Sequence, residues 1–258
     1  MNKSNTIITI LLFILGSICF IFFDIKPITI LEDEIANKLL CGFISRFGLS
    51  LLFGWLLYQY SGRDFIIFNK DFLKSFVWTL PCFMVAFVNF PYSALISGEA
   101  YFINAHFVGF YILYILGIAI LEELIFRGSL ILLMSDLLKG KKHRPFFVTL
   151  ICASIFSLFH LTNLFGNLGN IAGVLLQCLY TFLIGAMLTV TILKTKNIWL
   201  CILIHAVFDF GGLLVIESIC GGNPQDLVFW ILTIISGVLC AGHIIFSLIK
   251  LEKDYVSK

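Results

Sequence analysis

The sequence predicts an all-α polytopic membrane protein with about eight transmembrane helices around a polar intramembrane cavity. Hydrophobic residues make up 60% of the 258 residues and charged residues only 12%, whereas a soluble domain averages about 45–50% apolar and about 25% charged residues. Long runs rich in Phe, Leu and Ile favour helices over the alternating pattern of a membrane barrel. The net charge of +2 is too small for a nucleic-acid-binding protein.

Eight stretches are long enough to cross a bilayer, because a hydrocarbon core of about 30 Å needs about 20 helical residues. We expect a single integral membrane domain over residues 1–258, and no internal repeat is evident. The fourth stretch is too long for an upright helix, so we expect it to tilt, kink or extend past the membrane surface. The stretches are Thr6–Phe23, Leu39–Tyr60, Ser75–Ile96, Phe107–Leu138, Phe146–Leu164, Ile171–Leu193, Ile198–Ile216 and Leu227–Ile249.

The basic residues predict how these stretches are oriented. If the N-terminus is cytoplasmic, the inner segments hold thirteen of the 17 Lys and Arg residues, while the outer loops hold only Lys26 and Lys38. This is the asymmetry of the positive-inside rule, and an even number of spans then places both termini in the cytoplasm. The inner basic residues are Lys3, Arg63, Lys70, Lys74, Lys139, Lys141, Lys142, Arg144, Lys194, Lys196, Lys250, Lys253 and Lys258.

The eight cysteines predict neither a disulfide framework nor a metal site. Seven of them lie inside predicted spans, and no C-x-x-C pair occurs. Small polarizable thiols of this kind pack well between apolar helices. We therefore interpret them as packing residues.

Ionisable residues inside the spans need a separate explanation, because each costs at least about 2.5–3.5 kcal/mol in the hydrocarbon. Six of the eight fall into three short patterns on three different spans. Of the other two, we expect Arg46 to neutralise a carboxylate of the cavity and His243 to be structural. Away from the ends of the spans, the eight are Arg46, Glu122, Glu123, Arg127, His160, His205, Asp209 and His243.

The first pattern buries two adjacent carboxylates, Glu122 and Glu123, ahead of Arg127. Adjacent side chains point to different faces of a helix, and Arg127 follows Glu123 at the spacing of a helical ion pair. Glu122 then has no local partner and could act as a base or a metal ligand. The alternative is that all three close a structural network between helices, and we favour that alternative for Glu123 and Arg127.

The second pattern places His160 four residues after Phe156, and the third places Asp209 four residues after His205. A lone buried histidine is more often a packing residue, whereas a His–Asp pair on one helical face is an orienting hydrogen bond or half of a metal site. Together, the side chains of the three patterns can supply one another with hydrogen-bond partners and counter-charges around one cavity. Glu122, His160 and His205 would also match a catalytic zinc ligand set with an open position for water.

The ordered set Glu122-Glu123-x-x-x-Arg127, Phe156-x-x-x-His160 and His205-x-x-x-Asp209 resembles the motifs of the CAAX protease and bacteriocin-processing family. This family is also called the Abi family and includes the type II CAAX prenyl endopeptidases. The resemblance covers a motif-bearing core of about residues 107–216. It implies an all-helical membrane fold and hydrolysis of a peptide bond in or near the bilayer.

By this resemblance, Glu122 and His160 correspond to the residues that hold and activate water. His205 and Asp209 correspond to the pair that stabilises the oxyanion or helps to hold a metal, and Glu123 and Arg127 support the site. The last motif residue is often Asn in this family. An ionised Asp209 cannot donate to an oxyanion. Asp209 is therefore protonated, orients His205 or binds a metal, and we favour the orienting role.

The resemblance predicts an intramembrane endopeptidase that acts on a small or membrane-associated peptide or on a lipidated protein. The composition, rich in Ile, Lys and Phe and low in Pro, and the lack of targeting signals predict a bacterial plasma membrane protein. Such an enzyme uses either a zinc ion, as a metalloprotease, or a metal-free glutamate mechanism, and the sequence leaves both open. Two alternatives also stay open. One is a non-catalytic bacteriocin self-immunity protein on the same fold, and the other is a small-solute or proton transporter, since buried ionisable residues also form relays.

Overall fold

The computed structural model describes residues 3–22, 28–60, 71–166 and 168–256. Some residues used in the sequence analysis lie outside these ranges, namely Phe23, Lys26, Arg63, Lys70 and Lys258. The side chains of Lys3 and Cys19 are likewise outside the description. The remaining predictions can be compared with the structure directly.

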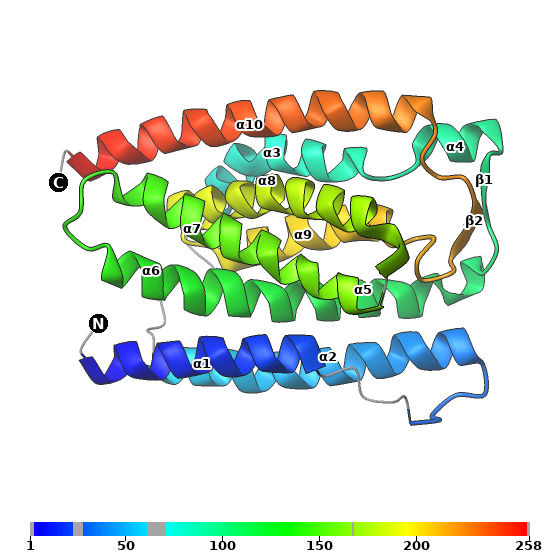
Figure 1. The fold of residues 1–258 in the computed structure, drawn as a ribbon, viewed down its shortest axis with the longest axis horizontal. Helices are drawn as coiled ribbons and strands as arrows, with labels where there is room; N and C mark the ends of the chain where they lie inside the picture. The colour runs from blue at the N-terminus through cyan, green and yellow to red at the C-terminus, as the bar shows by residue number, and fades with distance from the viewer. Residues whose placement is uncertain (1–2, 23–27, 61–70, 167, 257–258) are drawn as a thin grey trace.

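The described chain is almost entirely helical, and its long helices run roughly parallel in one elongated bundle (Figure 1). In chain order the elements are α1 (Lys3–Phe22), α2 (Glu34–Tyr60), α3 (Phe72–Val88), α4 (Tyr92–Ser97), β1 (Ala100–Phe102), η1 (Ala105–Phe107), α5 (Val108–Glu123), η2 (Leu124–Leu130), α6 (Ile131–Leu137), α7 (Arg144–Phe159), η3 (His160–Gly166), η4 (Leu168–Asn170), α8 (Ile171–Thr195), α9 (Ile198–Gly212), β2 (Cys220–Gly222) and α10 (Leu227–Val256).

Five helical stretches among the described residues are long and apolar enough to cross a membrane. They are Glu34–Gln59, Ala105–Leu137, Arg144–Phe165, Ile171–Thr195 and Leu227–Tyr255. Three shorter apolar helices, Ile7–Ile18, Phe72–Val88 and Ile198–Gly212, overlap the first, third and seventh predicted stretches. The chain is therefore an all-α polytopic membrane protein.

Two predicted stretches are shorter in the structure than the sequence indicated. Helix α3 ends at Val88, and the predicted stretch to Ile96 is wrong beyond that point. Pro91 disfavours a helical conformation at Phe90, and the chain turns there into the short α4. Helix α9 ends at Gly212 instead of Ile216. A Cβ atom built on Gly211 would lie 2.5 Å from the Asn89 carbonyl oxygen, so the two helix ends meet backbone to backbone.

The long fourth stretch contains an irregularity that the sequence analysis allowed for as a kink. Between α5 and α6, residues Leu124–Leu130 form a π-helical segment, η2, and all of its residues are buried. Such segments are rare and occur frequently at functional sites, because the extra residue in the turn changes where the side chains point. Arg127 lies within this segment.

A small strand pair closes the end of the bundle opposite the C-terminus (Figure 1). Strands β1 and β2 are antiparallel, with Ala100 opposite Gly222 and Phe102 opposite Cys220. The sequence analysis predicted no strand. Three-residue strands that contain Ala, Gly and Cys carry little of the β-branched and aromatic signal from which strands are recognised.

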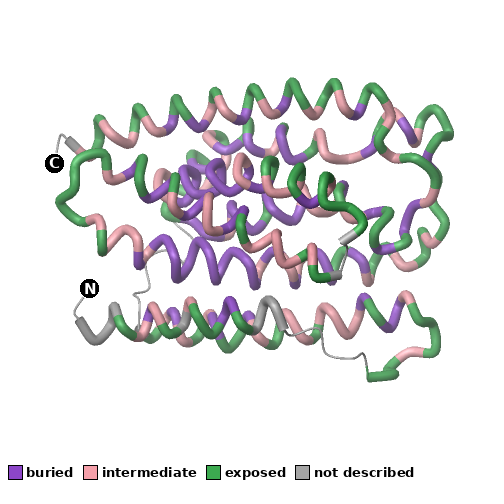
Figure 2. The backbone as a smooth tube through the Cα atoms, in the orientation of Figure 1, coloured by how far each residue is buried: buried purple, intermediate pink, exposed green. Residues whose placement is uncertain are grey.

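Helices α1 and α2 lie along one side of the bundle and α10 along the opposite side, with α5, α7, α8 and α9 between them (Figure 1). Buried residues concentrate on these inner helices, as Figure 2 shows. The seven cysteines whose side chains are described are free thiols. The inner helices carry the three motifs predicted from the sequence.

Candidate active site

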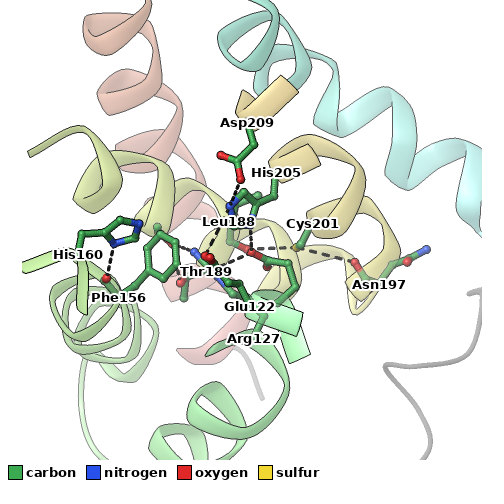
Figure 3. A network of polar contacts seen from close by, with 12 residues as sticks. Glu122, Arg127, Phe156, His160, Leu188, Thr189, Asn197, Cys201, His205 and Asp209 are labelled. Carbon is green, nitrogen blue, oxygen red and sulfur yellow. Dashed lines mark hydrogen bonds and ion pairs between the residues drawn. The ribbon is translucent and has the colours of Figure 1, made fainter. Parts of the chain in front are cut away.

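The motif residues come from four elements of the bundle centre (Figure 3). Glu122 and Glu123 end α5, and Arg127 follows in η2. His160 directly follows α7. His205 and Asp209 lie one turn apart on α9. Helix α9 packs against α5, so residues separated by more than 80 positions meet in the core.

Glu123 and Arg127 form the predicted ion pair. Arg127 Nη1 donates to Glu123 Oε1 over 2.9 Å, and the two side chains are only 2% and 0% exposed. Arg127 Nη2 also donates to the Gly185 carbonyl oxygen at 3.4 Å. Its guanidinium carbon lies 4.3 Å from the centre of the Phe156 ring. The buried cation is therefore held by a carboxylate, a backbone carbonyl and an aromatic face together.

His205 lies at the centre of the polar contacts. Its Nδ1 atom donates to Glu123 Oε1 over 2.8 Å, the same oxygen that accepts from Arg127. Its Nε2 atom lies 3.4 Å from Asp209 Oδ2 and 3.7 Å from Glu122 Oε2. Asp209 lies close to His205, as expected. The shorter contact, which orients the His205 ring, is made by Glu123 on the facing helix.

Two carboxylate oxygens of this cluster are buried without a hydrogen-bond donor among the described residues. They are Oε2 of Glu122 and Oε2 of Glu123. Buried polar atoms in native proteins are nearly always hydrogen-bonded, so an exception indicates a functional group or a bound water. Glu122 differs from Glu123 because neither oxygen of Glu122 accepts a hydrogen bond from Arg127 or from the Nδ1 atom of His205.

His160 approaches the cluster from the other side of Phe156. Its Nδ1 atom lies 3.0 Å from the Phe156 carbonyl oxygen. A carbonyl can only accept, so Nδ1 carries the proton and Nε2 of the neutral ring can accept a hydrogen bond. The Phe156 ring packs edge-on against both imidazoles, with centroid distances of 5.0 Å to His160 and 6.0 Å to His205. Within the described chain, no hydrogen bond or ion pair joins His160 to Glu122.

The described residues do not fit the zinc ligand set that the sequence admitted. Among them, no group of three or more His, Cys, Asp or Glu side chains is arranged to hold a metal ion. Glu122 and His205 approach each other at 3.7 Å, while His160 lies across the Phe156 ring. No chemical step is therefore derived through a metal.

Two residues that the sequence analysis missed fix the end of α9. Tyr111 Oη donates to the Phe210 carbonyl oxygen over 2.7 Å, and Asn89 Nδ2 donates to the Phe208 carbonyl oxygen over 2.8 Å. The last four carbonyls of a helix lack partners within it, and that of Phe210 is one of them in α9. The Phe208 and Phe210 carbonyls flank Asp209. A buried tyrosine hydroxyl needs a hydrogen-bond partner, which is the signal that could have drawn attention to Tyr111.

The two remaining ionisable residues of the spans lie outside the cluster. Arg46 Nη1 donates to the Gly42 carbonyl oxygen at 3.3 Å, and its guanidinium carbon lies 5.1 Å from the centre of the Tyr114 ring. His243 Nε2 lies 3.4 Å from Cys82 Sγ. The expectation that His243 is structural agrees with this neutral contact.

Comparison with known proteins finds a similarity over the part of the chain that carries the motifs. Residues 104–211 match the family model of the Rce1-like proteins, described as type II CAAX prenyl endopeptidase Rce1-like. This range contains all three motifs. Searches of curated proteins and of solved structures gave no match. The resemblance stated from the motifs is thus confirmed: residues 104–211, about two fifths of the chain, are similar to the Rce1-like type II CAAX prenyl endopeptidases.

Proposed function

We propose that the protein hydrolyses a peptide bond of a membrane-associated or small peptide, with Glu122 as the general base. The family supports a CAAX-type membrane endopeptidase in general. The observation that carries the specific proposal is the buried Oε2 atom of Glu122, which has no hydrogen-bond donor among the described residues and lies 3.7 Å from His205 Nε2. A carboxylate oxygen in this situation can accept a proton from water.

In the proposed reaction, Glu122 and His160 activate a water molecule. Glu122 takes one proton from the water while Nε2 of His160 accepts a hydrogen bond from it, and the resulting hydroxide attacks the scissile carbonyl carbon. When the tetrahedral intermediate collapses, the C–N bond breaks and Glu122 passes the proton to the leaving amine. The products are one new carboxyl terminus and one new amine.

His205 stabilises the transition state in this proposal. Protonated at both nitrogens, it donates from Nε2 to the developing oxyanion, and a donor of this kind contributes about 3–4 kcal/mol. The Nδ1 contact with Glu123 at 2.8 Å fixes the ring. Asp209 acts through His205 as a positioning residue, because an ionised carboxylate would repel an oxyanion.

We further propose that eight helices cross the bilayer around a polar cavity, as one domain with both termini cytoplasmic in a bacterial plasma membrane. In support, Lys194 Nζ lies 2.8 Å from Asp254 Oδ2, so the basic segment after α8 and the end of α10 lie at the same end of the bundle. Reporter fusions after Lys142 and after Lys196 should both report a cytoplasmic location. An external location of either would contradict this topology.

The activity is tested on purified protein in proteoliposomes. Synthetic peptides that carry a prenylated or an unmodified cysteine, and a bacteriocin-type precursor, are incubated with and without a chelator, and products are identified by mass spectrometry. We expect cleavage of at least one peptide at a single bond, and loss of that cleavage in His160→Ala at equal membrane insertion. Full activity of His160→Ala would contradict the proposed role of His160. Peptide binding without cleavage would favour a self-immunity protein instead.

A further inference from the structure

A groove of about 740 Å³ lies between the beginning of α7 and the last turns of α10. The beginning of α7 and the last turns of α10 lie at the end of the bundle that holds the C-terminus (Figure 1). None of the motif residues lines the groove, so it is separate from the active site. The lining residues are His143, Phe146, Ile245, Leu248, Ile249, Glu252 and Lys253.

The walls of this groove are apolar and partly exposed. Phe146 is 44% exposed, and Ile245 and Ile249 are 59% and 52% exposed. They belong to two of the helical stretches that are long and apolar enough to cross a membrane. The volume falls within the range of about 300–1,000 Å³ that is usual for small-molecule sites. The groove can therefore hold a hydrocarbon chain alongside the two helices.

The rim of the groove is basic. His143 and Lys253 line it directly, and the exposed lysines 139, 141 and 142 directly precede His143. Arg144 begins α7 and holds its guanidinium carbon 5.7 Å from the centre of the Tyr255 ring. Cations in this position at the end of two membrane helices attract anionic lipid headgroups.

The one carboxylate that lines the groove is already engaged. Glu252 Oε1 accepts from the Phe146 backbone N–H at 3.4 Å, and Glu252 Oε2 lies 3.6 Å from His143 Nδ1. Nearby Asp254 pairs with Lys194. These contacts compensate the acidic side chains and leave Lys253 and the basic loop to face a ligand.

We propose that this groove binds an anionic glycerophospholipid. One acyl chain lies against Phe146, Ile245 and Ile249, and the phosphate group lies at Lys253 and the basic loop that precedes α7. The bound lipid would link the beginning of α7 to the end of α10. The proposal does not depend on peptide-bond hydrolysis, so it can fail while the proposed function stands.

The test is native mass spectrometry of the full chain in detergent, titrated with phosphatidylglycerol or with phosphatidylcholine of the same acyl chains. We expect phosphatidylglycerol to bind at least fivefold more tightly. Each lost basic residue should weaken it about fivefold, so the double variant Lys253→Gln, Arg144→Gln should lose about 25-fold and leave phosphatidylcholine unaffected. Filling the groove with Ile245→Trp should weaken both lipids.

The matched control is Lys74→Gln, which removes one charge from an exposed position at the beginning of α3 but does not line the groove. It should change phosphatidylglycerol binding less than twofold. Equal binding of the two lipids, an equal loss in Lys74→Gln and Lys253→Gln, or a protein dimer in place of the lipid complex would each overturn the proposal. If Ile245→Trp fails to fold, the charge variants decide alone.

Discussion

Two clusters of polar side chains are buried between the helices, and they differ in charge. The charged cluster consists of Glu122, Glu123, Arg127, His205 and Asp209, together with His160 across the Phe156 ring. The neutral cluster consists of Cys82, Thr191 and His243. In the neutral cluster, Cys82 Sγ lies 3.4 Å from His243 Nε2 and 3.7 Å from Thr191 Oγ1, and the Trp78 ring packs on His243 with a centroid distance of 4.9 Å.

This difference in charge shows that the burial of polar side chains does not by itself identify a functional site. Among the described residues, the neutral cluster contains no buried side-chain nitrogen or oxygen without a hydrogen-bond partner, whereas the charged cluster contains two such carboxylate oxygens. Neutral groups that satisfy one another stabilise helix packing. Charged groups with spare acceptor capacity cost free energy, and in membrane proteins they mark functional sites.

The largest effect on stability is expected for Arg127→Met. The substitution leaves the fully buried Glu123 carboxylate without its counter-charge, and breaking such a pair costs about 3–5 kcal/mol. The control is Lys194→Met, which breaks the more exposed pair with Asp254 and should cost about 0–1 kcal/mol. Denaturant unfolding in detergent measures both. Equal losses of unfolding free energy would show that the charged cluster depends no more on its ion pair than the protein surface does.

His205→Phe should lower the turnover number by about 100- to 1,000-fold, because it removes the proposed oxyanion donor and keeps a ring of similar shape. The measurement is kcat on the cleaved peptide, with unfolding followed in parallel. Activity within tenfold of wild type in a folded variant would remove His205 from the proposed mechanism.

Glu123→Gln should have a smaller effect, about 10- to 100-fold, as is usual when a residue that orients another is altered. The amide oxygen can still accept from His205 Nδ1, but the charge is lost. Since Glu123 acts through His205, kcat should fall while KM stays within about twofold. A rise in KM alone would place Glu123 in substrate binding instead.

The smallest effect is expected in the neutral cluster. His243→Phe keeps the ring beside Trp78 and loses one hydrogen bond to Cys82, so the free energy of unfolding should fall by about 1 kcal/mol. The turnover number should stay within twofold of wild type. A tenfold loss of activity at unchanged stability would break the distinction between the two clusters.

Contacts within one helix could be predicted from the sequence. The ion pair of Glu123 with Arg127 and the proximity of His205 to Asp209 follow from the four-residue spacing, because such side chains are neighbours on a helix surface. The class of fold follows from composition and from the length of the apolar runs. These inferences depend on local geometry, which one chain segment determines.

Contacts between helices could not be predicted in this way. The bond between Glu123 and His205 depends on how α5 packs against α9, and the place of Phe156 between two histidines depends on α7 as well. The π-helical segment η2 and the early end of α3 also depend on tertiary packing and on a single proline. Sequence reasoning named side chains that the structure brings close to His205, but it missed the contact by which Glu123 joins Arg127 to His205.

The most direct test of the account is the initial rate of peptide cleavage by Glu122→Gln, measured in proteoliposomes beside wild type and His243→Phe. Glutamine preserves the size of the side chain but cannot take a proton from water, and general base catalysis contributes about 100- to 10,000-fold. The account predicts that Glu122→Gln loses at least about 100-fold while His243→Phe cleaves at the wild-type rate. A Glu122→Gln variant with the wild-type rate would contradict it.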